Sequence, residues 1–240
     1  MHGAMCISYS GRCLLSDYLD GRSSNRGACV QSCRWRYEVR ALNATNGQSE
    51  WLPIEQDERG TFIFNSKDLN MLSALNELKK AGVSSFKIEG RMKSGYYLAT
   101  VINAYKRLLN GEDFETCLAE LNNVAHRDYT QAYAFGENAQ TVNYQDSQSK
   151  GEYTYIADVL ASENGLVYAQ MRNRFKKGER LEVLSPTQNF GKTFTVEEIY
   201  DSKGAWTEDG KLVCETYRIA CPYALSKGDY LRRKNGTRIE

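Results

Sequence analysis

Four of the seven cysteines of this chain lie within its first 33 residues. Four thiolates can complete a metal site of the Cys₄ type, which holds either zinc or an iron–sulfur cluster. The spacing C-x6-C-x15-C-x3-C lacks the close pairs of zinc ribbons, which favours a cluster without deciding the metal. Packed, reduced thiols are the alternative, since free cysteine is often buried. The predicted ligands are Cys6, Cys13, Cys29 and Cys33.

Charged side chains gather in the segment FKIEGRMKS. If this segment is a strand, Lys87 and Glu89 share one face, and Arg91 and Lys93 follow just past its end. Such a group suits a small dicarboxylate or an RNA phosphate, and we interpret Lys87, Glu89 and Arg91 as candidate catalytic residues. The alternative is an ordinary solvated strand face with a Lys–Glu pair.

The segment AHRDYT combines several reactive side chains. Histidine is the usual proton shuttle near neutral pH, so His126 is a further catalytic candidate. Arg127 and Lys93 are candidates for contact with RNA. A solvated helix end is the alternative for this segment.

A third polar group lies in the segment CRWRY, where aromatic and arginine residues alternate. Such side chains stack on unpaired bases and hold phosphate groups. Arg34, Trp35 and Arg36 are therefore candidates for RNA binding. An arginine-bearing strand edge would give the same pattern.

Composition sets the broad class of protein. The chain has 240 residues, of which 41% are hydrophobic, with a formal net charge of +1. These values are normal for a globular protein, and the net charge does not indicate a nucleic-acid or membrane partner. Because we see no signal-peptide pattern and no apolar run of about 18 residues, we expect a cytoplasmic protein, where disulfides rarely persist.

The elements that position these residues fall into two predicted domains, residues 1–145 and 151–240. The first reads as a cysteine-rich loop over residues 1–40, an irregular stretch over 41–60, and then helix, strand and two helices, an order typical of an α/β domain with parallel strands. The predicted elements are helices 65–82, 94–111 and 113–125 and a strand at 83–90.

The second predicted domain follows a polar linker at residues 143–152. Beyond it, short runs rich in strand-forming residues alternate with turn signals such as SENG and DSKG. This regular spacing indicates a small antiparallel barrel or sandwich.

The first cysteine segment, GAMCISYSGRCLLS, resembles the signature of the collagenase-like peptidase family U32, position by position. The segments NRGACVQSCRW, GTFIFNSKDL, KIEGRMKS and HRDYTQAY resemble further blocks of that family, in the family's order. Within the family, the chain is most similar to the members that hydroxylate RNA, in particular those that make 5-hydroxyuridine at the tRNA wobble position. In the last block, Ala132 and Tyr133 depart from the family pattern.

The resemblance implies a fold and a reaction. The first domain would hold the later strands of a TIM-like (β/α) barrel, with the N-terminal half missing, and the second domain would be a small antiparallel β-barrel. The four cysteines would bind a 4Fe–4S cluster. Hydroxylation would depend on prephenate, a small dicarboxylate, and not on O₂. Because half a barrel exposes strand edges, we expect aggregation or dimerisation of the chain alone.

Two other functions compete with tRNA hydroxylation. The family name suggests a collagenase-like peptidase, but the sequence has no H-E-x-x-H helix and no G-x-S-x-G turn. A non-catalytic RNA-binding module with structural zinc would also explain the cysteines.

Overall fold

The structure is a computed structural model that describes residues 1–4, 13–34, 39–42, 49–52, 67–90, 93–132, 134–135 and 151–237. The chain forms two compact units. The first comprises Met1–Glu89 and His126–Ser149, and the second comprises Gly90–Ala125 and Lys150–Glu240. No helix in the described ranges has the length and apolar character needed to cross a membrane.

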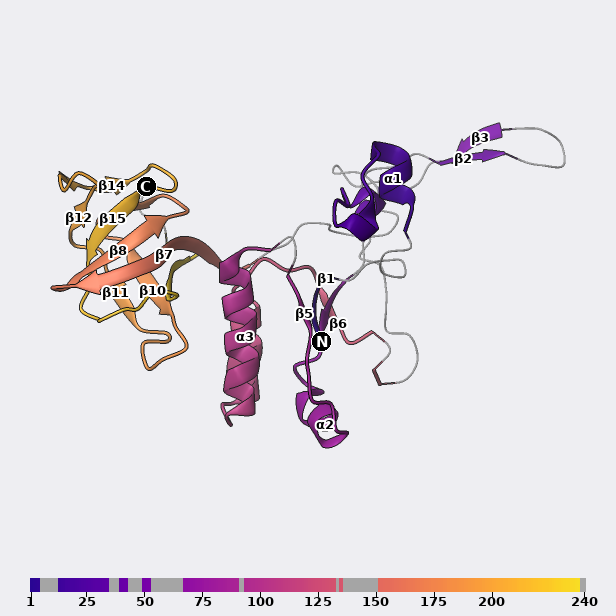
Figure 1. The fold of residues 1–240 in the computed structure, drawn as a ribbon, viewed down its shortest axis with the longest axis horizontal. Coiled ribbons are helices and arrows are strands. Elements are labelled where there is room, and N and C mark those ends of the chain that lie inside the picture. Colours follow the sequence, from indigo (N-terminus) through magenta and orange to yellow (C-terminus); the bar gives the residue numbers. More distant parts are fainter. Residues whose placement is uncertain are drawn as a thin grey trace. The chain divides into compact units, whose positions relative to one another are not determined.

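The first unit is built on a small mixed sheet with the strand order β5-β1-β4-β6 (Figure 1). β1 runs parallel to β5, and β4 runs parallel to β6, but β1 and β4 are antiparallel. The predicted all-parallel arrangement is therefore wrong for this pair, and the TIM-like barrel stays a prediction. The strands are β1 (His2–Ala4), β4 (Asp68–Asn70), β5 (Ile88–Glu89) and β6 (Tyr129–Thr130).

The strand β4 lies where the leucine spacing predicts the start of a helix. The observed helix α2 covers only Leu75–Lys80. Asp68 and Asn70 are buried, and the backbone of β4 bonds to β1 on one side and to β6 on the other. Pairing with distant strands thus overrides the local helical pattern. Likewise, only two residues of the predicted strand at 83–90 form a strand.

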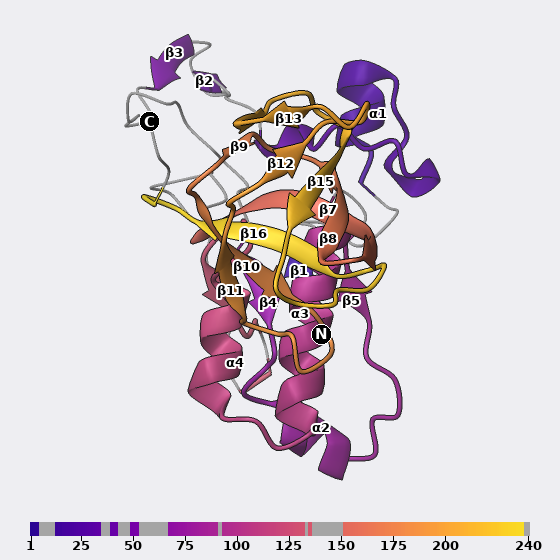
Figure 2. The same ribbon diagram turned by 90° about the vertical axis from the view of Figure 1, so that its left-hand side faces the viewer.

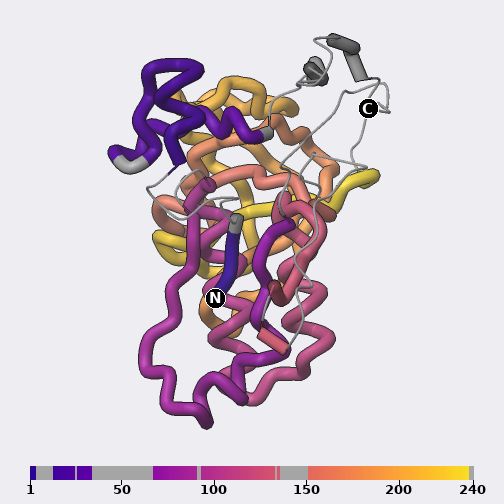
Figure 3. Tube along the Cα trace, turned by 90° about the vertical axis from the view of Figure 1, so that its right-hand side faces the viewer, coloured from indigo at the N-terminus to yellow at the C-terminus, as the bar shows by residue number. Residues whose placement is uncertain are grey.

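Glycine at position 3 allows β1 to lie close against β5. Gly3 has φ +118°, and a Cβ atom there would lie 2.3 Å from the carbonyl oxygen of Glu89. No L side chain fits at that distance, so a substitution would push the two strands apart. Figure 3 shows the indigo start of the chain running beside magenta segments of this unit.

The N-terminal region contains more regular structure than expected. Short helices interrupt the cysteine-rich loop, and a two-stranded hairpin occupies part of the stretch predicted to be irregular. The elements are α1 (Leu15–Asp20), η1 (Ser24–Arg26), η2 (Ser32–Arg34), β2 (Val39–Leu42) and β3 (Ser49–Leu52).

Two helices of the second unit confirm the predictions for residues 94–111 and 113–125. They are α3 (Gly95–Leu109) and α4 (Phe114–Leu121), which pack side by side (Figure 2). Each begins at a capping side chain. Ser94 Oγ accepts from the backbone N–H of residue 97 at 3.2 Å, and an Asp113 carboxylate oxygen accepts from that of residue 116 at 2.9 Å.

An antiparallel sheet forms the rest of the second unit, with the order β11-β10-β16-β7-β8-β15-β12-β13. It is a curled half-barrel, as Figures 1 and 2 show, which confirms the antiparallel prediction. Its strands are β7 (Tyr153–Glu163), β8 (Leu166–Met171), β10 (Arg180–Leu184), β11 (Thr193–Thr195), β12 (Ile199–Tyr200), β13 (Trp206–Thr207), β15 (Thr216–Ala220) and β16 (Tyr230–Lys234). A separate pair consists of β9 (Phe175–Lys176) and β14 (Asp209–Gly210).

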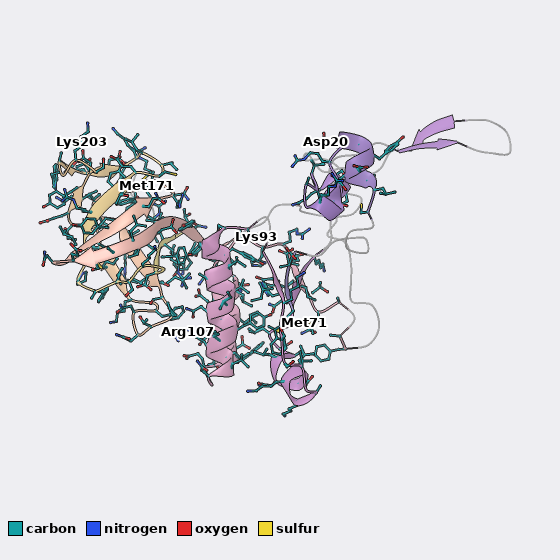
Figure 4. The ribbon with its side chains drawn as sticks, viewed as in Figure 1. Asp20, Met71, Lys93, Arg107, Met171 and Lys203 are labelled. Carbon is teal, nitrogen blue, oxygen red and sulfur yellow. The ribbon has the colours of Figure 1, made fainter. Side chains whose placement is uncertain are left out.

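The inner face of this sheet packs into an apolar core, and α3 packs within the same unit. Asn103 of α3 donates to the carbonyl oxygen of Ser185 at 2.7 Å, and the guanidinium of Arg107 lies 3.7 Å from the ring centre of Phe190. Figure 4 labels Arg107 on α3 and Met171 on β8. Residues Gly90–Ala125 thus group with the β-rich residues in space. The predicted domain boundary at residues 145–151 stays a prediction.

Candidate functional site

The cysteine loop is held together by serine side chains. Ser16 is fully buried in α1, and its Oγ donates to the carbonyl oxygen of Arg22 at 2.7 Å and accepts from the N–H of Val30 at 3.0 Å. Ser24 Oγ donates to the carbonyl oxygen of Cys13 at 2.6 Å. These bonds join the segment around Cys13 to the segment that leads to Cys29. The sequence analysis did not single out the two serines, because their spacing follows no recognisable motif.

Three of the four predicted cysteine ligands belong to the described residues, and all three are half-buried: Cys13, Cys29 and Cys33. The sulfur of Cys29 accepts a backbone N–H from Gln31 at 3.3 Å, and hydrogen bonds of this kind tune cluster sulfurs. Cys6 lies outside the described residues. Among the described side chains, no group of three His, Cys, Asp or Glu residues could hold a metal ion. The Cys₄ site therefore stays a prediction.

Lys87 and Glu89 form an ion pair on the surface of the first unit. Lys87 Nζ lies 3.7 Å from the Glu89 carboxylate, and the two side chains are 84% and 44% exposed. This geometry matches the solvated strand face, and in this structure neither side chain has the buried position that a barrel interior would give it. Arg91 lies outside the described residues.

Lys93 belongs to the second unit and lies just before α3, as Figure 4 shows. Its Nζ donates to the carbonyl oxygen of Ala125 at 3.1 Å and lies 4.8 Å from the ring centre of Tyr97. The lysine thus links the start of α3 to the segment after α4. Trp35, Arg36 and the side chain of Arg34 lie outside the described part of the chain, so their predicted contact with RNA stays a prediction.

Arg127 makes a buried ion pair with Asp68. Its Nε and a terminal nitrogen lie 3.0 and 2.5 Å from one carboxylate oxygen of Asp68, and its backbone N–H donates to the other at 3.2 Å. The side chains are 3% and 0% exposed. The arginine therefore fixes β4 against the segment that leads into β6, and its predicted contact with RNA stays a prediction.

His126 stacks on Tyr129. The ring centres are 4.0 Å apart and the planes are inclined by 7°. The other histidine, His2, is buried and lies 5.5 Å from the same tyrosine ring, so both histidines of the chain pack around Tyr129. Their pairing could not be read from the sequence, since the two histidines belong to the two separate segments that form this unit.

The hydrogen bond of His126 fixes its tautomer. Nδ1 lies 2.7 Å from the carbonyl oxygen of Arg127, which can only accept, so Nδ1 carries a proton. In the neutral ring, Nε2 is then the nitrogen that can take up a proton. The neighbouring buried pair of Asp68 and Arg127 holds this segment in place. The arrangement can therefore position one proton acceptor where β4 and β6 both begin.

Comparison with known proteins identifies the family. The sequence profile of Peptidase family U32 matches residues 1–144, and that of the Peptidase family U32 C-terminal domain matches residues 151–232. The chain belongs to peptidase family U32. The two matched segments together cover most of the chain.

The relatives of the chain include tRNA hydroxylation proteins and collagenases. The chain is 36% identical over 220 residues to tRNA hydroxylation protein P1 of Bacillus subtilis and 31% identical over 249 residues to tRNA hydroxylation protein P of Escherichia coli. Each alignment covers 85% of this chain, and 50% and 54% of those proteins. The chain thus spans about half the length of these relatives.

A collagenase of Porphyromonas gingivalis is 34% identical over 144 residues, which is 57% of this chain and 33% of that protein. Among solved structures, the C-terminal domain of a Geobacillus thermoleovorans U32 protein aligns with a TM-score of 0.32 and 20% identity, covering 33% of this chain and 99% of that one.

Proposed function

We propose that this chain belongs to an enzyme that hydroxylates tRNA, at the wobble uridine. The observation that carries this proposal is the extent of the similarity. The tRNA hydroxylation proteins align over 85% of the chain and into its β-rich unit, whereas the collagenase aligns over 57%. A shared C-terminal region is expected where the substrate is shared.

The reaction requires partners beyond the residues of this chain. Replacing the C5–H of uridine by C5–OH adds one oxygen atom and removes two electrons from the base, so a hydroxyl donor and an electron acceptor are both needed. Prephenate is the proposed co-substrate, and a 4Fe–4S cluster is the proposed cofactor, held by Cys6, Cys13, Cys29 and Cys33. Such a cluster would supply a Lewis-acidic or redox-active iron when bound.

The chain's own residues would handle a proton and hold the site. His126 Nε2 is placed to take up a proton, because Nδ1 is already used as a donor. Asp68 and Arg127 hold that segment against β4. Lys87, just before β5, and Glu89 of β5 are exposed at the β5 edge of the same sheet, where they remain accessible to a charged co-substrate.

Expression in a bacterium that lacks its own tRNA hydroxylation protein tests the proposal. We expect the chain, supplied with the rest of its protein, to restore hydroxylated uridine, as quantified by mass spectrometry of digested tRNA. Cys13→Ser should abolish the product together with bound iron and sulfide. Cys214→Ser is the matched control, because this exposed cysteine lies in the β-rich unit, outside the predicted ligand set.

Two outcomes would contradict the proposal. If Cys13→Ser still gives hydroxylated uridine at the wild-type level, the cluster is not required for the reaction. Zinc in place of iron, with no hydroxylated uridine, would favour an RNA-binding module. The peptidase alternative is favoured by the collagenase similarity, and cleavage of collagen by the same preparation, without any change in tRNA, would support it.

A further inference from the structure

A row of aromatic and basic side chains crosses four neighbouring strands of the second unit. The register pairs Tyr200 with Trp206 on one side and with Arg218 on the other, and it pairs Arg218 with Tyr168. Directly opposed residues of antiparallel strands point to the same face of a sheet. We call this set the aromatic–arginine row: Trp206 of β13, Tyr200 of β12, Arg218 of β15 and Tyr168 of β8.

The row lies on the outer face of the sheet. The adjacent residues Ile199, Ile219 and Val167 are fully buried in the core. Because successive side chains of a strand alternate between faces, Tyr200, Arg218 and Tyr168 point away from that core. The outer face of an antiparallel sheet usually carries polar residues, so three aromatic rings in one row call for an explanation.

Two cations lie beside rings of the row. Trp206 is 53% exposed, and Lys177 Nζ lies 5.5 Å from its ring centre. The guanidinium of Arg218 lies 5.8 Å from the ring centre of Tyr200. Gly204, with φ +87°, leaves room for that guanidinium, since a Cβ atom there would lie 2.4 Å from it. Arginine and lysine are thus held near the aromatic faces.

Lys203 adds a further positive charge in the turn between β12 and β13, at the far end of the sheet in Figure 4. The nearby carboxylates already have donors. Glu198 accepts from the Tyr200 hydroxyl at 2.9 Å, and Asp201 accepts from the backbone N–H groups of Lys203 and Ala205 at 2.9 and 2.8 Å. The row therefore presents rings and cations, and its acidic neighbours are engaged in local bonds.

We propose that the aromatic–arginine row binds unpaired nucleotides of RNA. Bases stack on exposed aromatic rings, while arginine and lysine contact the phosphates between them. With strands about 4.8 Å apart, the row is about 14 Å long, enough for roughly two or three nucleotides. The choice of RNA rests on the proposed function, whereas the preference for single strands follows from the rings themselves.

Fluorescence anisotropy of a short fluorescein-labelled oligouridylate, titrated with the full chain, tests the proposal. Trp206→Ala should weaken binding about tenfold, since one stacking ring is lost. Arg218→Ala should weaken it several-fold and reduce the salt dependence, with the slope of log K against log salt falling by about 0.7. Tyr200→Phe keeps the ring and should bind as the wild type does.

Matched controls lie elsewhere on the chain. Tyr18→Ala removes an exposed ring from the first unit, and Arg180→Ala removes an exposed charge from β10, so both should leave the affinity unchanged. Thermal unfolding of each variant checks that Trp206→Ala and Arg218→Ala fold, because cross-strand aromatic pairs also stabilise sheets.

Several results would overturn the proposal. They are the absence of binding by the wild type, equal affinity of Trp206→Ala, preference for an RNA duplex over the single strand, and displacement by a Gly-Pro-Pro peptide. If the variants lose binding but the wild type does not hydroxylate tRNA, the RNA-binding role of the row stands and the proposed function is rejected. If the variants bind like the wild type and the wild type hydroxylates tRNA, the proposed function stands and the role of the row is rejected.

Discussion

The outer face of the curled sheet has two halves that use similar residues differently. Over β10, β16 and β7, helices α3 and α4 cover the face, and its aromatic and charged side chains are buried among them. Over β8, β15, β12 and β13, the aromatic–arginine row carries an exposed tryptophan. We call the first region the helix-covered half.

Arg232 shows how the helix-covered half uses its charge. Its guanidinium makes two bonds to Glu120 of α4, at 2.5 and 2.8 Å, and two to Glu182 of β10, at 3.0 and 2.5 Å. Its side chain is 2% exposed. Arg218 lies instead beside a tyrosine ring. The same residue type therefore joins elements in one half and faces outward in the other.

The largest expected effect distinguishes these two arginines. Arg232→Met leaves the buried Glu120 and the half-buried Glu182 without their shared cation, and we expect the free energy of unfolding to fall by about 3–5 kcal/mol. Arg218→Met should change it by less than about 0.5 kcal/mol. Urea denaturation measures both, and equal losses would contradict the division into two halves.

Aromatic residues should differ in the same way. Tyr96 of α3 is buried and stacks on Tyr155, with ring centres 4.9 Å apart and planes inclined by 10°. Tyr96→Ala should therefore lower the free energy of unfolding by about 3 kcal/mol, because a large ring leaves a cavity. Trp206→Ala should cost less than about 1 kcal/mol. A larger loss at Trp206 would mean that the row is part of the folding core.

A smaller effect concerns alkaline pH. Burial, together with its hydrogen bond to Glu182, raises the pKa of Tyr153 to about 12 from its usual 10. Because the folded state holds this proton more tightly than the unfolded state, the contribution is complete below pH 10 and is lost as the pH rises towards 12. Urea denaturation across this range should therefore show a shallower fall in stability for Tyr153→Phe. An identical slope in the variant and the wild type would reject this assignment.

The smallest effect is expected at an exposed pair outside both halves. Arg174 donates to Asp209 at 2.9 and 2.5 Å, and this bond lowers the pKa of the Asp209 carboxyl. The pair contributes above the unfolded pKa and is lost as the pH falls through the folded one, but solvent screens it. Asp209→Asn should therefore unfold like the wild type in urea at neutral pH. A clear loss would show that exposed pairs here matter as much as the buried Arg232.

Local signals predicted the helices of the second unit well. The capping side chains of Ser94 and Asp113, and the apolar stripes that follow them, lie within a few residues of the helices that they specify. The prediction for the residues of β4 was wrong for the opposite reason. Its bonding partners are β1 and β6, which are distant in the sequence, so the leucine pattern at residues 69–78 gave a helix where pairing makes a strand.

The candidate site shows the same limit. Residue type alone singled out His126 and Arg127, but Asp68, 59 residues away from Arg127, lay inside the predicted helix 65–82 and was not a candidate. The aromatic–arginine row was missed because its members come from four separate strands, and only their register brings them together. Register is set by pairing and turn geometry, which the chemistry of single residues does not reveal.

Photocrosslinking with tRNA that contains 4-thiouridine tests the central claim most directly. The uridine analogue joins to side chains that touch it, and mass spectrometry of the digested protein locates the joined peptides. We expect adducts on peptides that contain Trp206, Tyr200 or Arg218, and their loss in Trp206→Ala. Adducts confined to peptides of α3 and α4, or no adducts anywhere on the second unit, would contradict the account.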